Sequence, residues 1–174
     1  MEAEEVIRQA NEVDVCALSV LINSAYRGES SKKGWTTEAD LLGGMRTDEE
    51  SLHQLIKKEG SVLLVYSSHN KIIGCVNLQK QGEKMYLGML TVLPRMQARG
   101  IGKKLLQASE EYSNQQECSA IIMTVISMRQ ELIQWYERRG YKLTGEKKPF
   151  PSNDPKFGLP KQDVEFVVME KTLF

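Results

Sequence analysis

The stretch LTVLPRMQARGIGKKLL, residues 90–106, decides the fold class of this 174-residue chain. It begins with alternating β-branched and apolar residues, which predict a strand, and Pro94 ends that strand because proline cannot donate a ladder hydrogen bond. Gly100 and Gly102 follow, and apolar residues then recur at every third or fourth position. The stretch therefore predicts a strand that passes through a glycine-containing turn into a long helix over about 101–116.

The turn before this helix has the composition of an anion-binding site. A helix N-terminus leaves four backbone N–H groups without intrahelical partners and carries roughly half a positive charge. Glycines at positions 100 and 102 keep side chains away from that backbone, although they can also serve only a tight turn and close helix packing. Side chains that can add donors or positive charge are Gln97, Arg99, Lys103 and Lys104. Because neither GxxxxGK(S/T) nor GxGxxG with a later acidic residue is present, the common nucleotide loops fit poorly.

Composition narrows the class of protein. Lysine plus arginine and aspartate plus glutamate number 23 each, so no overall field favours nucleic acid or an acidic membrane surface. Three separated cysteines without CxxC spacing indicate neither a disulfide framework nor a metal site. The acidic N-terminus resembles no targeting peptide, and no apolar run is long enough to cross a membrane. We expect a cytoplasmic protein that forms a single domain over residues 1–174.

The remaining elements follow from hydrophobic periodicity and turn residues. Strands are expected over 4–9, 61–68, 71–80, 84–93, 119–127, 141–146 and 163–173. Helices are expected from Asp14 to Tyr26, over 37–58 with a break near Gly43-Gly44 and a restart at Asp48, and over 129–140. Loops are expected over residues 27–35 and 147–161. This order predicts an α/β (α+β) chain with a mixed sheet, antiparallel early and crossing through helices later.

Two segments resemble the GNAT superfamily of acyl-CoA-dependent N-acetyltransferases. Gln97-Ala98-Arg99-Gly100-Ile101-Gly102 follows Val92-Leu93-Pro94, and Trp135-Tyr136-Glu137-Arg138-Arg139-Gly140-Tyr141 comes one helix and one strand later, in the family's order. The resemblance covers about 60–145 closely and the remainder by element order. It implies a mostly antiparallel central sheet of about seven strands flanked by about four helices, with a splay between the fourth and fifth strands.

The resemblance also implies acetyl-CoA as cosubstrate and no metal. Backbone groups of Leu90 and Val92 are then expected to bind the pantetheine arm, which requires the neighbouring strand to diverge, as a bulge near Gly88 to Leu90 can cause. Arg129 stands where many members carry asparagine, and offers a phosphate or substrate ligand instead. The diphosphate is expected to lie on Gln97, Ala98, Arg99, Gly100, Ile101, Gly102 and Lys103.

For catalysis, the resemblance places Tyr136 at the general-acid position, where a phenol that stays protonated at neutral pH can donate to a departing thiolate. It makes the backbone N–H of Val92 the donor to the developing oxyanion. Residues 85–87, Met-Tyr-Leu, occupy the region where some members carry a base glutamate, so no base can be transferred. We favour a water relay over the titratable side chains Glu83, His53 and His69.

The acceptor pocket implied by the resemblance includes Tyr26, Arg27 and Trp35. Aromatic and cationic side chains suit a small metabolite with its own carboxylate, whose primary amine attacks acetyl-CoA directly in a ternary complex. Two alternatives remain at this point, a non-catalytic acyl-CoA-binding regulatory module and a protein N-terminal or lysine acetyltransferase. We expect a monomer or homodimer that binds neither nucleic acid nor membrane.

Overall fold

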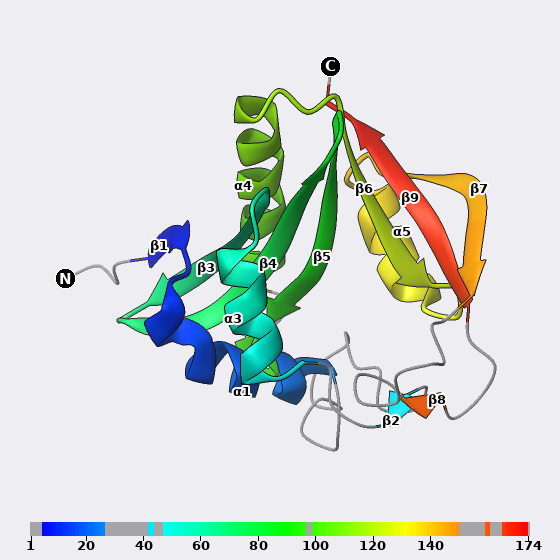
Figure 1. Cartoon of the computed structure of the whole chain (residues 1–174). Helices are drawn as coiled ribbons and strands as arrows, with labels where there is room; N and C mark the ends of the chain where they lie inside the picture. Colours follow the sequence, from blue (N-terminus) through cyan, green and yellow to red (C-terminus); the bar gives the residue numbers. More distant parts are fainter. Residues whose placement is uncertain are drawn as a thin grey trace.

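The computed structural model describes residues 5–26, 42–43, 47–96, 99–149, 159–160 and 165–173 (Figure 1). The helices are α1 (Val15–Tyr26), α3 (Glu49–Lys57), α4 (Ile101–Gln115) and α5 (Gln130–Glu137), with 3-10 turns over Glu12–Asp14 and Pro94–Met96. The strands are β1 (Glu5–Gln9), β2 (Leu42–Gly43), β3 (Ser61–Ser68), β4 (Lys71–Gln81), β5 (Lys84–Val92), β6 (Ala120–Ile126), β7 (Lys142–Pro149), β8 (Leu159–Pro160) and β9 (Glu165–Thr172).

Seven strands form the central sheet in the order β1-β3-β4-β5-β6-β9-β7, and β2 pairs separately with β8. Every neighbouring pair in the central sheet is antiparallel except β5 and β6, which are parallel because the helix α4 crosses between them. Figure 1 shows β5 and β6 meeting at one end and separating toward the other. The predicted mixed sheet of seven strands, with its splay, is therefore confirmed.

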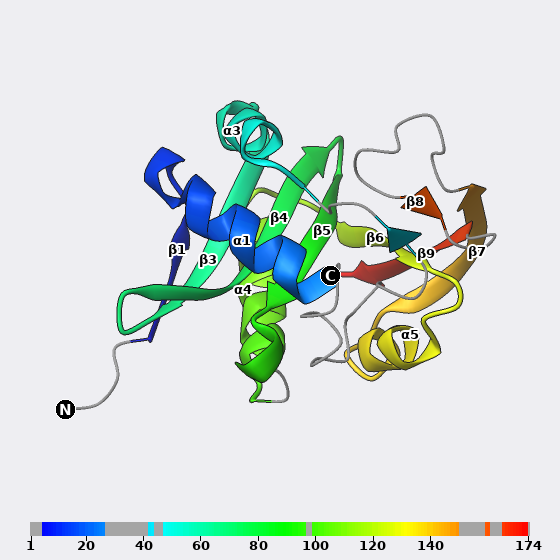
Figure 2. The ribbon, with the colours of Figure 1, turned by 90° about the horizontal axis from the view of Figure 1, so that it is seen from below.

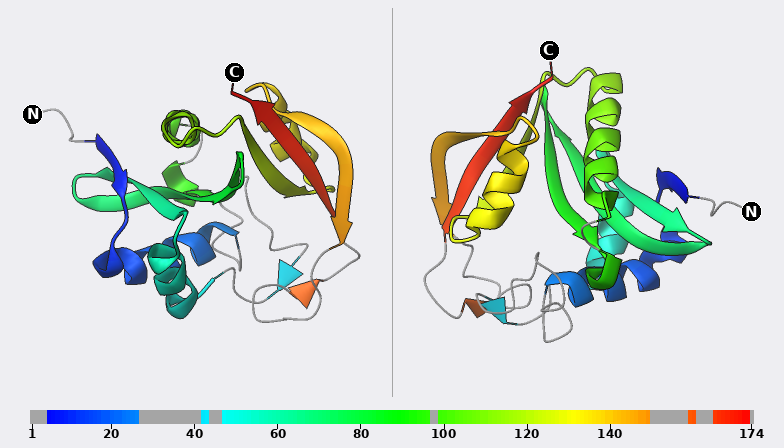
Figure 3. Two further views of the ribbon diagram at one scale, coloured as in Figure 1. Left: turned by 45° about the horizontal axis from the view of Figure 1, so that its top comes forward. Right: turned by 180° about the vertical axis from the view of Figure 1, so that it is seen from behind.

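The two faces of the sheet are covered by different helices, as the views in Figures 2 and 3 show. On one face, Leu105 of α4 and Ile133 of α5 belong to a large apolar core. On the other face, Leu18 of α1 and Leu52 of α3 pack in a second core against residues such as Val65 of β3. Alternate residues of each strand contribute side chains to the two cores, since successive side chains of a strand point to opposite faces.

Most predicted elements are confirmed within one or two residues, and three differ. The helix expected over 129–140 ends at Glu137, and residues 138–140 form a turn. The helical region expected over 37–58 is helical from Glu49 and capped by Asp48, but Leu42–Gly43 form a short strand that pairs with Leu159–Pro160. Strand β7 also continues to Pro149, inside the segment expected as a loop, because Lys147 to Pro149 pair with β9. The predicted loop 27–35 lies outside the described residues, as do residues 37–41 and 44–46 of the predicted helical region and residues 150–158 and 161 of the second predicted loop.

Asn11 caps the 3-10 turn that leads into the first helix, and the prediction of Asp14 as the N-cap was wrong, since Asp14 is the third residue of that turn. A 3-10 turn over Glu12–Asp14 precedes the helix, so the capping position falls three residues earlier. Asn11 Oδ1 accepts a hydrogen bond from the N–H of Val13 (3.1 Å), and Asp14 Oδ2 accepts one from the N–H of Asn11 (2.9 Å). Both oxygens of Asp14 also accept from the guanidinium of Arg8, at 2.8 and 3.0 Å. Asp14 thus ties β1 to α1 as the reciprocal member of a capping box.

We predict that Asp14→Ala lowers the free energy of unfolding by about 1–2 kcal/mol at neutral pH, the range for a lost cap. The Arg8 guanidinium and then the backbone N–H of Asn11 lower the pKa of Asp14. A lowered pKa means that the stabilisation is present above the unfolded-state pKa of about 4 and is lost as the pH falls through the folded-state value. Urea unfolding of wild type and variant should therefore differ at neutral pH and converge in acid.

The matched control is Glu12→Ala, which removes a neighbouring exposed carboxylate that pairs with Lys57 at 3.1 Å. Its effect should stay within about 0.5 kcal/mol, as for other exposed ion pairs. Equal losses for the two variants at neutral pH would contradict the role assigned to Asp14.

Candidate active site

The site is built around the separation of β5 and β6. Their parallel pairing covers three described residues of each strand, from Lys84 opposite Ala120 to Tyr86 opposite Ile122. Beyond that point β6 stays paired with β9 as far as Ile126, whereas β5 stays with β4. Beyond Tyr86 and Ile122, each of the two strands therefore stays paired only with its neighbour on the other side, and the sheet opens between β5 and β6.

A β-bulge in β5 accompanies this opening. Gly88 pairs with Asn77 and Thr91 pairs with Cys75, so two residues of β5 lie opposite a single residue of β4. Met89 carries the irregular backbone, with φ of 54°. Its carbonyl oxygen accepts a hydrogen bond from the hydroxyl of Thr91 at 2.8 Å. The bulge predicted near Gly88 to Leu90 is confirmed, and it increases the local twist of β5.

The two glycines before and within α4 have different roles. Gly100 is the N-cap, with φ of 80°, which is left-handed backbone, and its carbonyl accepts from the N–H of Lys104. A β-carbon on Gly100 would meet no atom within 4 Å among the described residues, so the glycine is needed for its backbone conformation and the space beside it is open. A β-carbon on Gly102 would lie 3.5 Å from the ring of Trp135, so this glycine lets α4 approach α5.

The basic side chains at the start of α4 have two different environments. Arg99 and Lys103 are exposed beside the turn. Lys104 instead reaches toward β1, where its Nζ lies 3.3 Å from Glu5 Oε2 and 5.9 Å from the centre of the Tyr66 ring. Lys104 therefore stabilises the contact of α4 with β1 and β3. Gln97 and Ala98 lie outside the described residues.

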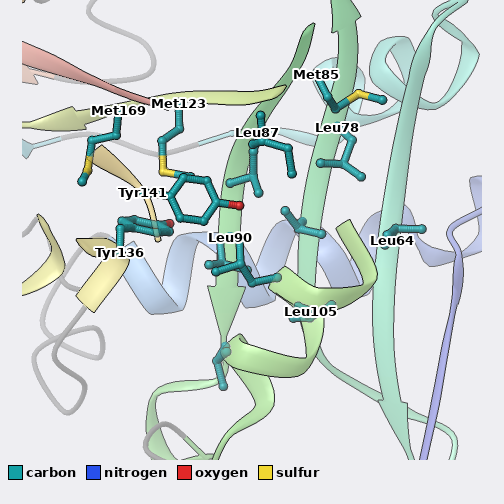
Figure 4. Packing of buried hydrophobic residues seen from close by; sticks show 14 of the residues in the cluster. Leu64, Leu78, Met85, Leu87, Leu90, Leu105, Met123, Tyr136, Tyr141 and Met169 are labelled. Atoms are coloured by element: carbon teal, nitrogen blue, oxygen red, sulfur yellow. The ribbon is translucent and has the colours of Figure 1, made fainter. Parts of the chain in front are cut away.

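Tyr136 is held inside the core by two other rings. It is 5% exposed, and its ring stands edge-on to Trp135 at 5.1 Å and to Tyr141 at 5.7 Å between centroids. Figure 4 shows Tyr136 and Tyr141 on the side of the opening covered by the α4–α5 core, with Tyr141 between Met123 of β6 and Leu90 of β5. The phenol proposed as a general acid thus lies next to Tyr141 in the core on this face of the sheet.

Tyr141 is buried more completely, at 1% exposure, and its hydroxyl has no hydrogen-bond partner within 3.5 Å among the described residues. Burial, followed by the nearby carboxylate of Glu110, raises the pKa of Tyr141. Glu110 of α4 forms an ion pair with Lys171 of β9. The hydroxyl of Tyr141 is consequently held in its neutral form beside an ion pair that links α4 to the sheet.

Two arginines lie at the ends of helix α5. Arg129 is its N-cap residue, three positions after the end of β6, and its N–H donates to the carbonyl of Ile126 at 3.0 Å. The guanidinium of Arg139 lies 3.8 Å from the centre of the Trp135 ring, and its Nη1 donates to the carbonyl of Trp135 at 2.9 Å. This stacked pair was not predicted from the sequence, although the spacing of four residues within the predicted helix 129–140 was the available signal.

The structure brings several of the predicted residues together. Leu90 and Val92 are buried in β5 past its last residue paired with β6, Ile101 is the buried first residue of α4, and Tyr136 belongs to the same apolar core. Tyr26 is the last residue of α1, whereas Arg27 and Trp35 lie outside the described residues.

No cluster of three metal-ligating side chains occurs among the described residues. No helix in the described part of the chain is long and apolar enough to cross a membrane.

Comparisons with known proteins agree with this geometry. Residues 37–151 match the model of the acetyltransferase (GNAT) domain family. The chain is also similar to the uncharacterized N-acetyltransferase YhfO of Bacillus subtilis, with 26% identity over 142 residues that cover 78% of this chain and 89% of the relative.

Two solved structures illustrate the likeness in fold. The ribosomal-protein-S18-alanine N-acetyltransferase of Escherichia coli has a TM-score of 0.73 at 13% identity, covering 98% of this chain and 94% of that protein. The acetyltransferase YncA of Salmonella typhimurium, described as putative and solved with its cofactor acetyl-CoA, has a TM-score of 0.72 at 16% identity, with the same coverage. At such identities these two likenesses establish a shared fold.

Proposed function

The chain belongs to the GNAT acetyltransferase family, and on that premise we propose that it transfers the acetyl group of acetyl-CoA to a primary amine of a small metabolite. The amine attacks directly while both substrates are bound. Residues 1–174 act as one domain in the cytoplasm, as a monomer or homodimer. The observation that carries this proposal is the separation of β5 from β6 beside a helix that begins at a left-handed glycine.

The start of α4 fits the diphosphate of acetyl-CoA. Its first turn is Ile-Gly-Lys-Lys and contains no carboxylate to oppose an anion, and no atom of the described residues lies within 4 Å of a β-carbon placed on Gly100. Unpaired N–H groups of a helix N-terminus attract phosphate oxygens. Backbone groups from Gln97 to Lys103 hold the diphosphate, with Arg129 as a further cationic ligand at the start of α5.

Strand β5 fits the pantetheine arm. After the bulge at Met89, Leu90 and Val92 follow on the part of β5 that is not paired with β6. Main-chain amides of an added extended segment can pair with strand backbone there, as in other cases of strand addition. This arrangement directs the acyl end of the coenzyme toward Tyr136.

When bound, acetyl-CoA supplies a thioester carbonyl as the acceptor of the amine nitrogen. The N–H of Val92 donates to the carbonyl oxygen as negative charge develops on it. A nitrogen–carbon bond forms, the carbon–sulfur bond breaks, and Tyr136 gives a proton to the departing sulfur. The proton lost by the amine goes to water, and the Tyr136 phenolate regains a proton from water, so the net proton count does not change. Edge-on contacts with Trp135 and Tyr141 fix the ring of Tyr136, which places its hydroxyl without further reorganisation.

The acceptor enters from the opposite face of the sheet. Helix α1 packs on that face against β4 and β5, and it ends at Tyr26. Tyr26, Arg27 and Trp35 form the acceptor side, and the guanidinium of Arg27 pairs with a carboxylate of the metabolite.

The proposal is tested by following release of free thiol from acetyl-CoA with a panel of amines. Amino acids and other small amines that carry a carboxylate should be turned over, and polycations and peptide N-termini should react more slowly. Binding of acetyl-CoA without turnover of any amine would support the regulatory-module alternative, and preference for peptides would support the protein acetyltransferase.

A second prediction concerns Gly100. Gly100→Ala should weaken the binding of coenzyme A by about tenfold or more. The substitution puts alanine into left-handed backbone and adds a methyl group beside the start of the helix. Calorimetric titration measures this affinity. Gly82→Ala is the matched control, since Gly82 also has a positive φ (64°) and no atom within 4 Å of its β-carbon position, but lies in the β4–β5 turn. Both variants should lose about 1–2 kcal/mol of stability, and equal affinity losses would contradict the assignment.

A third prediction concerns the general acid. Tyr136→Phe should reduce kcat by about a hundredfold, the lower range for general acid catalysis, with little change in the Kd of coenzyme A. The matched control is Tyr66→Phe, which removes a hydroxyl from another buried tyrosine of the same core but on β3. Turnover and calorimetry on the two variants separate the effects. Wild-type kcat in Tyr136→Phe would rule out proton donation by this phenol.

A further inference from the structure

A pair of hydroxyl groups spans β5 and β6 where their backbone pairing stops. The last paired residues are Tyr86 and Ile122, and two residues further along β6 the Oγ1 of Thr124 lies 2.9 Å from the hydroxyl of Tyr86. This side-chain hydrogen bond continues the connection between the strands after the main-chain ladder has ended. It therefore lies at the closed end of the opening.

The register of the sheet places this pair on the face opposite Tyr136. Met85 and Leu87 belong to the core beneath α4 and α5, so Tyr86 between them points to the other face. Gln79, which pairs with Tyr86, is polar, and Gly88, the next residue of β5 on that face, has no side chain. A β-carbon on Gly88 would lie 3.4 Å from Cε1 of Tyr86. Position 88 therefore places no side chain against the tyrosine ring on the α1 face.

Tyr86 and Thr124 are both half-buried, and they are the polar groups that β5 and β6 present at this point. On the same face of the neighbouring strand, Val168 pairs with Thr124 and is apolar. Two hydroxyls share one proton in the hydrogen bond between them, which leaves one further proton and unused lone pairs for another molecule. A group that arrives from the α1 side thus meets two hydroxyls that have Val168 on the β9 side and Gln79 on the β4 side.

We propose that Tyr86, oriented by Thr124, positions the acceptor amine for attack, an inference that rests on the proposed function. The hydroxyl oxygen of Tyr86 accepts a hydrogen bond from one N–H of the amine. Holding that N–H fixes the direction of the nitrogen lone pair, which must point through the opening toward the thioester carbon. Tyr86 takes no proton in this role, so it is a positioning residue and the bonds made and broken are those given above.

The test uses the full chain and the amine that the wild-type enzyme turns over fastest in the panel. Tyr86→Phe keeps the ring and removes the hydroxyl, and kcat/KM for the amine should fall about five- to tenfold, the effect of one lost hydrogen bond. The Kd of acetyl-CoA should not change. Thr124→Val should lower kcat/KM for the amine in the same direction, and Thr124→Ser should restore it, because serine keeps the hydroxyl.

Tyr112→Phe on α4 is the matched control, a half-buried tyrosine on the other face of the sheet. Unchanged kcat/KM for the amine in Tyr86→Phe would overturn the inference. A parallel loss of acetyl-CoA affinity would also overturn it, since the hydroxyl pair would then only maintain the opening. If wild type turned over no amine, both this inference and the proposed function would fail. If wild type turned over an amine and Tyr86→Phe had the same kcat/KM for it, the inference alone would be rejected.

Discussion

The separation of β5 from β6 is the constraint on which the rest of the site depends. One extra residue at the Met89 bulge twists β5 away, while β6 stays in register with β9 along its whole length. The hydroxyl of Thr91 satisfies the Met89 carbonyl, and Asn77 and Cys75 pair on either side of the bulge. The opening is therefore built into the hydrogen bonding of the sheet, so it does not depend on a ligand to hold it.

The core beneath α4 and α5 includes side chains from both separated strands. Tyr141 belongs to the same core as Leu90 of β5 and Met123 of β6, and its ring packs against that of Tyr136 (Figure 4). Its hydroxyl stays neutral because burial raises its pKa, and the Glu110–Lys171 ion pair beside it fastens α4 to β9. A tyrosine at this position thus fills the space between diverging strands without placing a charge in the core.

Much of this arrangement could be predicted from local sequence signals. Alternation in 61–92, the glycine turn before α4 and the two family segments were enough for the sheet, the splay and the helix start. Asn11 was missed as a cap because the 3-10 turn shifts the helix, and the strand at Leu42–Gly43 depends on a partner more than a hundred residues away. The Tyr86–Thr124 contact likewise requires the parallel register of β5 and β6, which no local pattern encodes.

The Trp135 ring couples the start of α4 to the helix that carries Tyr136. One edge of the indole lies against Gly102, the Arg139 guanidinium covers a face, and the ring meets Tyr136 edge-on. A β-carbon at position 102 would lie 3.5 Å from this ring, which is ordinary van der Waals contact, so the glycine lets the indole lie against the first turn of α4. Gly102 therefore differs from Gly100 in its physical role: Gly100 supplies a backbone conformation, and Gly102 lies at the contact between α4 and the indole that packs on Tyr136.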